Sequence, residues 1–345
     1  MDAFGGIMHY LVTGHTGFKG AWLTLLLTSQ GHTVSGIALD PEPGSLYEVA
    51  NLASHVKTDV RCDIRDVARV TEAIQEINPD VLIHLAAQPL VRRSYREPRE
   101  TFETNVNGTL NILEASQNCS NLKARVIITT DKVYKNVNRI EGYLETEPLG
   151  GDDPYSSSKA MADILTQSWI KSFPAMPTAI ARAGNVIGGG DVCEDRLIPD
   201  AVRAFTAGKP LQIRFPNAVR PWQHVLDCVN GYVALADELL AGEGLGEWNF
   251  GPGPESFVRV GDVVEAASAM WGDGATVELD KGPHPHEANL LALDSTKALT
   301  HLGWKNRVLY PESLGWTIEW EKRRFHGEDA LALTLEQLAE FSARG

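Results

Sequence analysis

A tyrosine and a lysine four residues apart are the first candidates for chemistry in this sequence. Tyr155 and Lys159 would share one face of a helix, where the ammonium group lowers the pKa of the phenol. A tyrosinate accessible near neutral pH can act as a general base. The segment Thr129–Lys132 lies one strand-to-helix step earlier, and the hydroxyl of Thr130 can complete a hydrogen-bonded set with Tyr155 and Lys159. The sequence therefore predicts acid–base chemistry around Tyr155.

A second pattern, Gly14-His-Thr-Gly-Phe-Lys-Gly20, is typical of a turn that binds a pyrophosphate. It follows a predicted strand at His9–Thr13 and opens a predicted helix at Phe18–Ser29, so backbone N–H groups can approach a phosphate at the positive end of the helix. Asp40 lies 20 residues after Gly20, the spacing of an acid that binds ribose hydroxyls and favours NAD over NADP. The alternative is a glycine-rich turn with a surface aspartate.

Asp63 follows a predicted third strand at Val56–Arg61, where the adenine of a dinucleotide would lie. Its carboxylate can accept a hydrogen bond from the adenine amino group. It can equally cap a turn of its own chain. The sequence leaves both roles open.

The elements that must position these residues alternate regularly in the first half of the chain. This alternation predicts a doubly wound α/β fold of the Rossmann type, a parallel sheet with right-handed crossovers. The later strands are expected at His32–Ala38, Val81–His84, Ala124–Ile128 and Thr178–Arg182, and the later helices at Val67–Ile77, Arg99–Ser116, Tyr155–Ser172 and Val225–Leu240.

The second half is rich in glycine and proline from Gly188 onward and predicts a smaller C-terminal α/β lobe that binds the substrate. We expect residues 1–186 to form the dinucleotide-binding domain, with 224–250 returning to it. Residues 187–223 and 251–345 are expected to form the smaller lobe.

Composition excludes several classes of protein. The 345 residues carry a net charge of −14, which disfavours nucleic-acid binding and attachment to anionic lipid. We expect no membrane partner, because the longest apolar runs are far shorter than a bilayer. The first ten residues lack the pattern of a secretory signal, and the four cysteines are scattered without a Cys-x-x-Cys pair. These features predict a cytoplasmic protein.

Beyond single motifs, the chain resembles the extended branch of the short-chain dehydrogenase/reductase superfamily, and within it the CDP-glucose 4,6-dehydratases. The stretches that carry the resemblance are Gly14–Gly20, His84–Tyr95, Thr130–Tyr134, Asp153–Lys159, Ala183–Asp191, Arg196–Asp200 and Arg220–His224. The resemblance implies an NAD-dependent lyase that moves a hydride from C4 to C6 of a nucleotide-linked glucose and eliminates water, giving a 4-keto-6-deoxy sugar. It also implies a homodimer through the helices expected at Arg99–Ser116 and Tyr155–Ser172.

By resemblance, the site residues fall into three groups. The catalytic residues are Thr130, Asp131, Lys132, Tyr155 and Lys159. The residues expected to bind NAD are Gly14, Thr16, Gly17, Phe18, Lys19, Gly20, Asp40, Asp63, Ile64, Ala86, Ala87, Tyr155 and Lys159. The residues expected to bind the nucleotide sugar are Gln88, Arg93, Asn185, Arg196, Leu197, Arg214, Arg220 and His286.

Asp131 and Lys132 are the residues expected to act in the loss of water. Asp131 is the expected acid for the departing 6-hydroxyl. Lys132 is either the C5 base, which requires a depressed pKa, or an electrostatic partner. A solvated turn pair is the alternative. No metal is expected, because His284, His286 and Glu287 lack a distant third ligand.

Two other functions compete with the dehydratase. A 4-epimerase or oxidoreductase of the same superfamily needs Tyr155, Lys159 and a hydroxyl but no acid at position 131. A non-catalytic NAD-binding regulator needs none of these side chains for its function. Val192 stands where the resembled family often has tryptophan, which leaves the nucleobase and the sugar open.

Overall fold

The fold is built on one parallel sheet of seven strands. A computed structural model describes residues 6–272, 274–280, 282 and 290–344. The sheet order is β11-β6-β5-β4-β1-β2-β3, and every neighbouring pair in it is parallel. The bounds are β1 (His9–Thr13), β2 (Thr33–Ala38), β3 (Asp59–Arg61), β4 (Val81–His84), β5 (Ala124–Ile128), β6 (Thr178–Ala183) and β11 (Gly246–Phe250). The predicted doubly wound sheet is confirmed.

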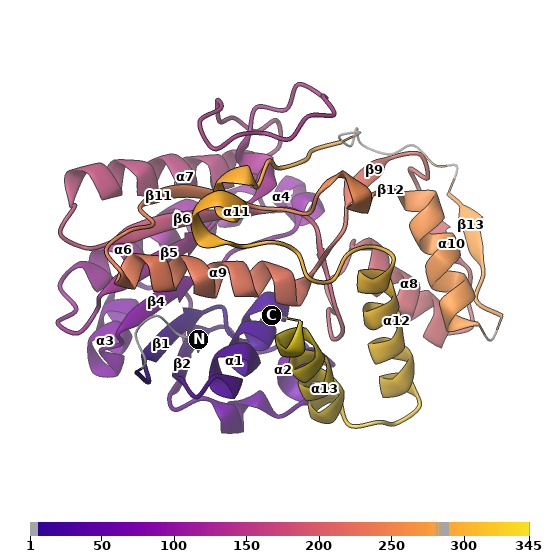
Figure 1. Cartoon of the computed structure of the whole chain (residues 1–345), viewed down its shortest axis with the longest axis horizontal. Coiled ribbons are helices and arrows are strands. Elements are labelled where there is room, and N and C mark those ends of the chain that lie inside the picture. The colour runs from indigo at the N-terminus through magenta and orange to yellow at the C-terminus, as the bar shows by residue number, and fades with distance from the viewer. Residues whose placement is uncertain (1–5, 273, 281, 283–289, 345) are drawn as a thin grey trace.

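Helices cover both faces of this sheet (Figure 1). Consecutive residues of β1 enter different cores because strand side chains alternate between faces. Val12 packs in the core that includes α1 and α9, whereas Leu11 packs in the core that includes α3 and α6. The bounds of these helices are α1 (Phe18–Ser29), α3 (Val67–Ile77), α6 (Gly108–Gln117) and α9 (Val225–Leu240). The long helix α7 (Pro154–Ser172) packs beside α6 and carries Tyr155 and Lys159.

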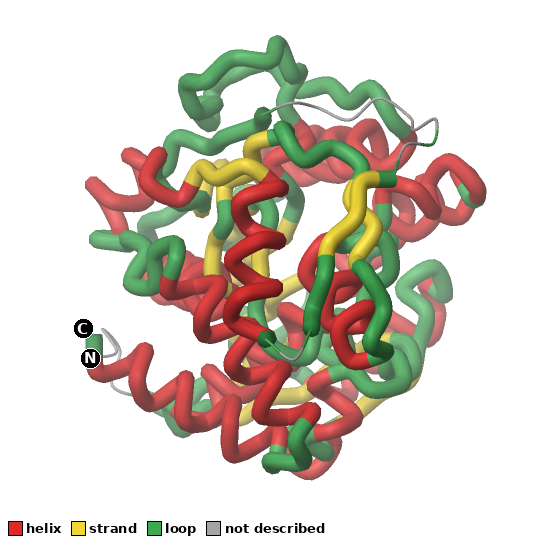
Figure 2. The backbone as a smooth tube through the Cα atoms, turned by 90° about the vertical axis from the view of Figure 1, so that its right-hand side faces the viewer, coloured by secondary structure: helices red, strands yellow, loops and turns green. Residues whose placement is uncertain are grey.

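A second lobe has its own core and lies beside the carboxyl ends of the strands; Figure 2 views it face on. Its buried side chains include Phe205, Trp222, Val263 and Leu314. The helices of this lobe are α8 (Leu197–Thr206), α10 (Val260–Trp271) and α12 (Glu312–Phe325). Its short strands pair as β7 (Val186–Ile187) with β10 (Gln223–His224), β8 (Leu211–Ile213) with β13 (Val277–Leu279), and β9 (Val219–Pro221) with β12 (Phe257–Arg259).

The third strand, expected at Val56–Arg61, is shorter in the structure, because β3 covers only Asp59–Arg61. Two larger differences concern helices. The helix expected at Arg99–Ser116 consists of α5 (Pro98–Phe102), a π-helical segment at Glu103–Asn107, and α6. Two C-terminal helices, α11 (Thr296–Leu302) and α13 (Ala330–Ala343), contribute to the core of the first lobe. They belong to the range 251–345 that we expected in the second lobe. The exact division into domains stays a prediction.

The remaining elements are short. They are α2 (Leu46–Val49), α4 (Val91–Arg96) and the 3₁₀ segments at Leu52–His55, Asp131–Val133 and Pro254–Ser256. Within the described part of the chain, no helix combines the length and the apolar character needed to cross a bilayer.

Candidate active site

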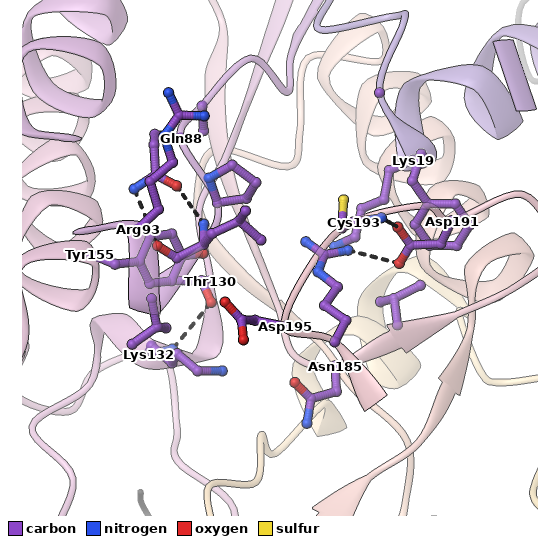
Figure 3. Close-up of a pocket in the computed structure, with 18 of the residues that line it drawn as sticks. Lys19, Gln88, Arg93, Thr130, Lys132, Tyr155, Asn185, Asp191, Cys193 and Asp195 are labelled. Atoms are coloured by element: carbon purple, nitrogen blue, oxygen red, sulfur yellow. Dashed lines mark hydrogen bonds and ion pairs between the residues drawn. The ribbon is translucent and has the colours of Figure 1, made fainter. Parts of the chain in front are cut away.

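The residues of the candidate site line a cavity of about 980 Å³. It is bordered by residues that follow the sheet strands and by residues of the second lobe (Figure 3). Every described residue that the sequence nominated for catalysis, cofactor or substrate lines this cavity. His286 lies outside the described residues. The fold therefore brings together side chains that are up to about two hundred positions apart in the sequence.

The glycine-rich turn after β1 leaves no room for a side chain at Gly14 or Gly20. Gly14 has a φ of +75°, and a Cβ there would lie 2.8 Å from the backbone nitrogen of Ala86. A Cβ on Gly20 would lie only 2.2 Å from the carbonyl oxygen of Gly14. Gly17 caps α1, whose first turn has free backbone N–H groups. A backbone cradle without side chains at a helix N-terminus fits the pyrophosphate of a dinucleotide.

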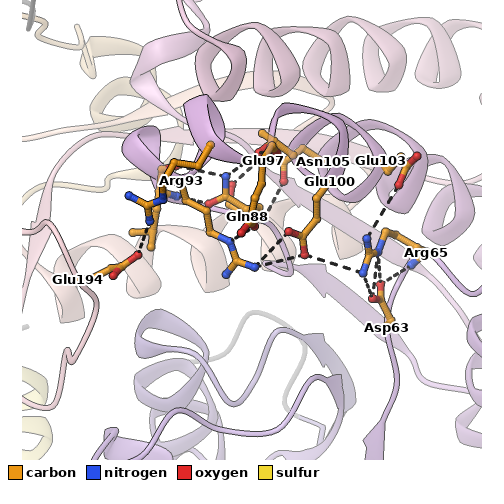
Figure 4. Close-up of polar contacts among 12 residues, drawn as sticks. Asp63, Arg65, Gln88, Arg93, Glu97, Glu100, Glu103, Asn105 and Glu194 are labelled. Carbon is orange, nitrogen blue, oxygen red and sulfur yellow. Dashed lines mark hydrogen bonds and ion pairs between the residues drawn. The ribbon is translucent and has the colours of Figure 1, made fainter. Parts of the chain in front are cut away.

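The expected ribose and adenine positions carry two carboxylates. The side chain of Asp40 is 90% exposed, and one of its oxygens lies 3.5 Å from Nε of Arg61. Asp63 accepts a hydrogen bond from the backbone nitrogen of Arg65 at 2.9 Å and forms an ion pair with the same residue at 2.6 Å (Figure 4). The Arg65 guanidinium outweighs burial and lowers the pKa of Asp63. Of the two roles considered for Asp63, turn capping is present in the structure; the adenine contact stays a prediction.

Tyr155 is buried, and the positive charges of Lys132 and Arg196 act on its phenol. Burial raises the pKa of Tyr155, while Lys132, a hydrogen bond with Thr130, and Arg196 lower it without offsetting burial. Lys159 instead donates a hydrogen bond to the carbonyl oxygen of Ile128 at 2.8 Å, and burial lowers the pKa of Lys159 to about 8. Lys132 is the foremost cation acting on the phenol, and the expectation that Lys159 lowers the pKa of Tyr155 stays a prediction.

Asp131 and Lys132 follow β5 at its carboxyl end. The Thr130 hydroxyl donates to Asp131 at 2.8 Å, and Nζ of Lys132 lies 3.3 Å from the same carboxylate oxygen. Asp131 is buried, which excludes a solvated turn pair. Burial lowers the pKa of Lys132, but Asp131 and Tyr155 outweigh it and hold the pKa above the usual value. The lysine therefore keeps its charge, which favours an electrostatic partner over a base.

Two of the arginines expected to bind the substrate lie near Tyr155 and Lys132. Arg196 precedes α8, and its guanidinium lies 3.0 Å from Asp191. Arg196 lowers the pKa of Tyr155, and Arg220 acts in the same direction on Lys132, so both lie near the reacting residues. Asn185 also faces this cavity. This cluster supplies positive charge in an otherwise acidic protein.

Two other nominated residues have partners within the chain. Arg93 binds Glu97 at 2.7 Å and Glu100 at 3.1 Å (Figure 4). The side-chain amide of Gln88 donates to Thr101 at 2.8 Å and accepts from the backbone nitrogen of Leu90 at 2.6 Å. Both side chains line the cavity while holding α4 and α5 in place, and their contact with a sugar stays a prediction.

Arg182, a further arginine near these segments, has a structural role. It forms an ion pair with Asp163 at 2.7 Å, and both side chains are fully buried. Its guanidinium also donates to the hydroxyl of Tyr134. This arginine connects β6 to α7, and its buried guanidinium is not accessible to a ligand.

Sequence reasoning missed several cavity residues. Arg92 and Asp195 form an ion pair at 3.1 Å, and Asp191 holds Arg196. Glu321 of α12 accepts a hydrogen bond from the backbone nitrogen of Gly190 at 2.7 Å, and burial raises the pKa of Glu321 to about 7. Arg92 and Asp191 lie within the stretches His84–Tyr95 and Ala183–Asp191, whereas no local motif marks Asp195 or Glu321. Their roles depend on partners from distant segments, which the sequence does not reveal.

A Rossmann-type sheet with a glycine-rich turn after β1 and a Tyr-x-x-x-Lys pair on α7 defines an extended short-chain dehydrogenase/reductase. The model of the family described as GDP-mannose 4,6 dehydratase matches residues 11–314, and the chain belongs to this family.

Curated relatives agree with this assignment. The chain is 45% identical over 341 residues to a protein named CDP-glucose 4,6-dehydratase from Salmonella typhimurium, covering 96% of this chain and 95% of that protein. It is 29% identical to a dTDP-glucose 4,6-dehydratase from Xanthomonas campestris pv. campestris, covering 90% and 92%.

Solved structures share the fold. DesIV, a dTDP-glucose 4,6-dehydratase from Streptomyces venezuelae with NAD and TYD bound, superposes with a TM-score of 0.81 and 24% identity, covering 94% of this chain and 100% of that chain. A UDP-glucose 4-epimerase from Thermus thermophilus in complex with NAD superposes with a TM-score of 0.79 and 24% identity, covering 93% and 99%. A dehydratase and an epimerase thus share this architecture, so the fold by itself does not choose between them.

Proposed function

We propose that the chain is an NAD-dependent CDP-glucose 4,6-dehydratase, a lyase that converts CDP-glucose to CDP-4-keto-6-deoxyglucose. The observation that carries the proposal is the buried carboxyl of Asp131 beside Lys132 and Thr130, in the same cavity as Tyr155. Elimination of the 6-hydroxyl requires an acid near the sugar, and an epimerase has no use for one. The 45% identity to a protein named CDP-glucose 4,6-dehydratase favours this substrate.

The cofactor half of the cavity fits NAD. The glycine-rich turn and the start of α1 receive the pyrophosphate, and Lys19 adds a positive charge there. Asp40 accepts hydrogen bonds from the ribose hydroxyls and disfavours a 2′-phosphate. NAD supplies the hydride acceptor and donor that links C4 to C6. The proposed cofactor contacts are Gly14, Thr16, Gly17, Phe18, Lys19, Gly20, Asp40, Asp63, Ile64, Ala86, Ala87, Tyr155 and Lys159.

Tyr155 removes the proton of the 4-hydroxyl in the first step. The charge of Lys132 lowers the pKa of the phenol and stabilises the phenolate. Lys159 donates a hydrogen bond to the carbonyl oxygen of Ile128 and so fixes the start of α7 against the end of β5. The resulting ketone at C4 acidifies the proton at C5.

C5 loses a proton in the elimination and, when the hydride returns to C6, regains the proton that Tyr155 took from the 4-hydroxyl. The carboxylate of Asp131 takes the C5 proton and passes it to the departing 6-hydroxyl, which leaves as water. This carboxylate already accepts a hydrogen bond from Thr130 and lies 3.3 Å from Lys132. A charged Lys132 cannot take a proton, so its role is to stabilise the negative charge that develops on the oxygens of the intermediate. The acid and the base of the two half-reactions therefore stand on adjacent elements, the segment after β5 and the start of α7.

The substrate half binds the nucleoside diphosphate. Asn185, Arg196 and Arg220 contact the diphosphate, Leu197 and Arg214 lie beside the nucleoside, and Gln88 and Arg93 face the sugar. Arginine suits this task because its planar guanidinium binds phosphate oxygens in pairs. This local positive charge explains how a chain with a net charge of −14 can hold an anionic substrate.

The test is incubation with CDP-glucose that carries deuterium at C4. We expect a 4-keto product with the label at C6. A galactose epimer, or a product without label at C6, would reject the dehydratase. Titration of the chain with CDP, dTDP, GDP and UDP by calorimetry tests the nucleobase, and we expect CDP to bind most tightly.

We further propose a homodimer that works in the cytoplasm. Met161 and Ile164 lie three residues apart on α7, and their side chains are 48% and 53% exposed, so α7 presents an apolar stripe to solvent. None of the four cysteines is paired in a disulfide, as expected for a reducing compartment. Sedimentation should give a dimer for the natural chain and a monomer for the double variant Met161→Glu, Ile164→Glu. A monomeric natural chain would reject the dimer.

A further inference from the structure

Two arginines converge on one carboxylate in the cavity. Nη1 of Arg92 lies 3.1 Å from Oδ1 of Asp195, and Nη1 of Arg214 lies 3.8 Å from the same oxygen. The three side chains are between 24% and 39% exposed. They line the main cavity and an adjoining hollow of about 310 Å³, and Asp195 is drawn among the cavity residues in Figure 3.

The three residues come from three separate segments. Arg92 lies on α4, Arg214 follows β8, and Asp195 lies in the loop before α8. Asp200 and Asp280 also border the hollow. Asp200 forms an ion pair with Arg203, whereas Asp195 contacts both Arg92 and Arg214.

The backbone of Asp195 is left-handed, with a φ of +59°. This conformation is unfavourable for most residues, although aspartate and asparagine adopt it more readily than others. The neighbouring Arg196 turns instead toward Asp191, at 3.0 Å. Loop geometry thus directs Asp195 and Arg196 to different partners within the same cavity.

The chemistry of the three groups suggests an exchange of partners. A diphosphate offers more negative charge and more acceptor oxygens than one carboxylate, and guanidinium groups bind phosphate oxygens in pairs. We propose that Asp195 holds Arg92 and Arg214 in the free protein, and that a nucleoside diphosphate displaces it, with its phosphate oxygens on Arg92 and its nucleoside beside Arg214. This inference rests on the proposed function, and it makes Arg92 a substrate-binding residue.

The decisive variant is Asp195→Asn, measured by calorimetric titration of the full chain with CDP. Asparagine keeps the size and tolerates the left-handed backbone, but it removes the competing charge. We expect CDP to bind about three- to tenfold more tightly, since a partly exposed ion pair has an influence of this order on an equilibrium. NAD affinity should not change. Arg92→Gln should weaken CDP binding about tenfold.

Glu194→Gln is the matched control. Glu194 is adjacent to Asp195 and bridges to Arg96, one turn along α4 from Arg92, at 3.0 Å. Both side chains of this second bridge are more than half exposed. The two bridges connect the same two segments, so a purely structural role predicts similar effects for both variants. We expect Glu194→Gln to leave CDP affinity unchanged.

Equal or weaker CDP binding by Asp195→Asn would overturn the inference, provided that its thermal unfolding matches that of the natural chain. If this variant fails to fold, unchanged CDP affinity in Arg92→Gln overturns the inference independently. A natural chain that binds another nucleoside diphosphate in place of CDP, with the same response to Asp195→Asn, rejects the proposed base and supports the exchange. A natural chain that binds no nucleoside diphosphate rejects both.

Discussion

The two halves of the cavity are built on different principles. The cofactor half is a contiguous turn, Gly14–Gly20, that presents backbone groups and depends on missing side chains. The substrate half consists of long charged side chains from distant segments, such as Arg92 and Asp195, which are 103 positions apart. A backbone cradle is rigid and has one shape, whereas paired charges can exchange partners. The cofactor half is therefore preformed, whereas in the proposed exchange of partners the substrate half responds to its ligand.

Tyr155→Phe should have the largest effect, because Tyr155 lies where the two halves meet. Loss of the phenol oxygen removes the general base, and we expect the rate of CDP-glucose turnover to fall about a thousandfold or more. The affinities for NAD and CDP should stay within about twofold of the natural chain. Turnover assays and calorimetry measure the two effects. Full retention of activity would favour the non-catalytic NAD-binding regulator.

Gly20→Ala should damage the cofactor half alone. The new Cβ would lie 2.2 Å from the backbone oxygen of Gly14, and a rigid turn cannot move away without losing its shape. We expect NAD to bind about a hundredfold more weakly, corresponding to about 3 kcal/mol of overpacking. CDP affinity should change little. Gly315→Ala is the control, because a Cβ at that position meets nothing within 4 Å. Unchanged NAD affinity in Gly20→Ala would contradict a preformed cradle.

Arg196→Gln should damage the substrate half alone. A charged hydrogen bond to a phosphate is worth about 1.5–3 kcal/mol, so the KM for CDP-glucose should rise at least tenfold. The KM for NAD should stay constant. Arg259→Gln changes an exposed arginine of the same lobe that pairs with Asp262, and it should alter neither value. A larger change in the KM for NAD than in the KM for CDP-glucose would contradict the assignment of Arg196 to the substrate half.

Lys132→Met should give the smallest and most specific change, a shift in pH dependence. Tyr155 acts as a base only after losing its proton, so activity is present above its pKa and disappears as the pH falls. Lys132 lowers this pKa. Its removal should move the acid limb of kcat/KM upward by about one pH unit.

Lys159→Met is the comparison for this experiment, because Lys159 binds the carbonyl of Ile128 and Lys132 is the foremost cation acting on the phenol. We expect a smaller shift of the acid limb than in Lys132→Met. An equal or larger shift would restore Lys159 as the main cation beside Tyr155.

Much of the fold was predictable from the sequence. β1 and β4, and the helices α1, α3 and α9, have the bounds that the apolar pattern predicted. Their signals are local, since strand and helix periodicities differ and glycine or charged residues mark the ends. The π-helical segment at Glu103–Asn107 was not predicted, because the apolar pattern of Arg99–Ser116 reads as one continuous helix.

The candidate site was predictable where its chemistry is local. The glycine turn, Thr130–Lys132 and the pair Tyr155 and Lys159 are motifs in single segments, and all of them line one cavity. The environments of these residues were not predictable. Burial raises the pKa of Tyr155, contrary to the expectation from sequence. Neighbouring charges keep Lys132 protonated, which favours one of the two roles that the sequence left open.

The sequence by itself determined the parallel sheet, its dinucleotide-binding turn and the residue types that can move protons. Tertiary structure decided which cation faces the phenol, which arginine is buried with Asp163 and which carboxylate meets Arg92. The physical reason is the distance over which the two kinds of interaction act. Backbone turns and helices depend on neighbours within a few positions, whereas the free energy of a charge depends on burial and on every other charge that the folded chain brings near it.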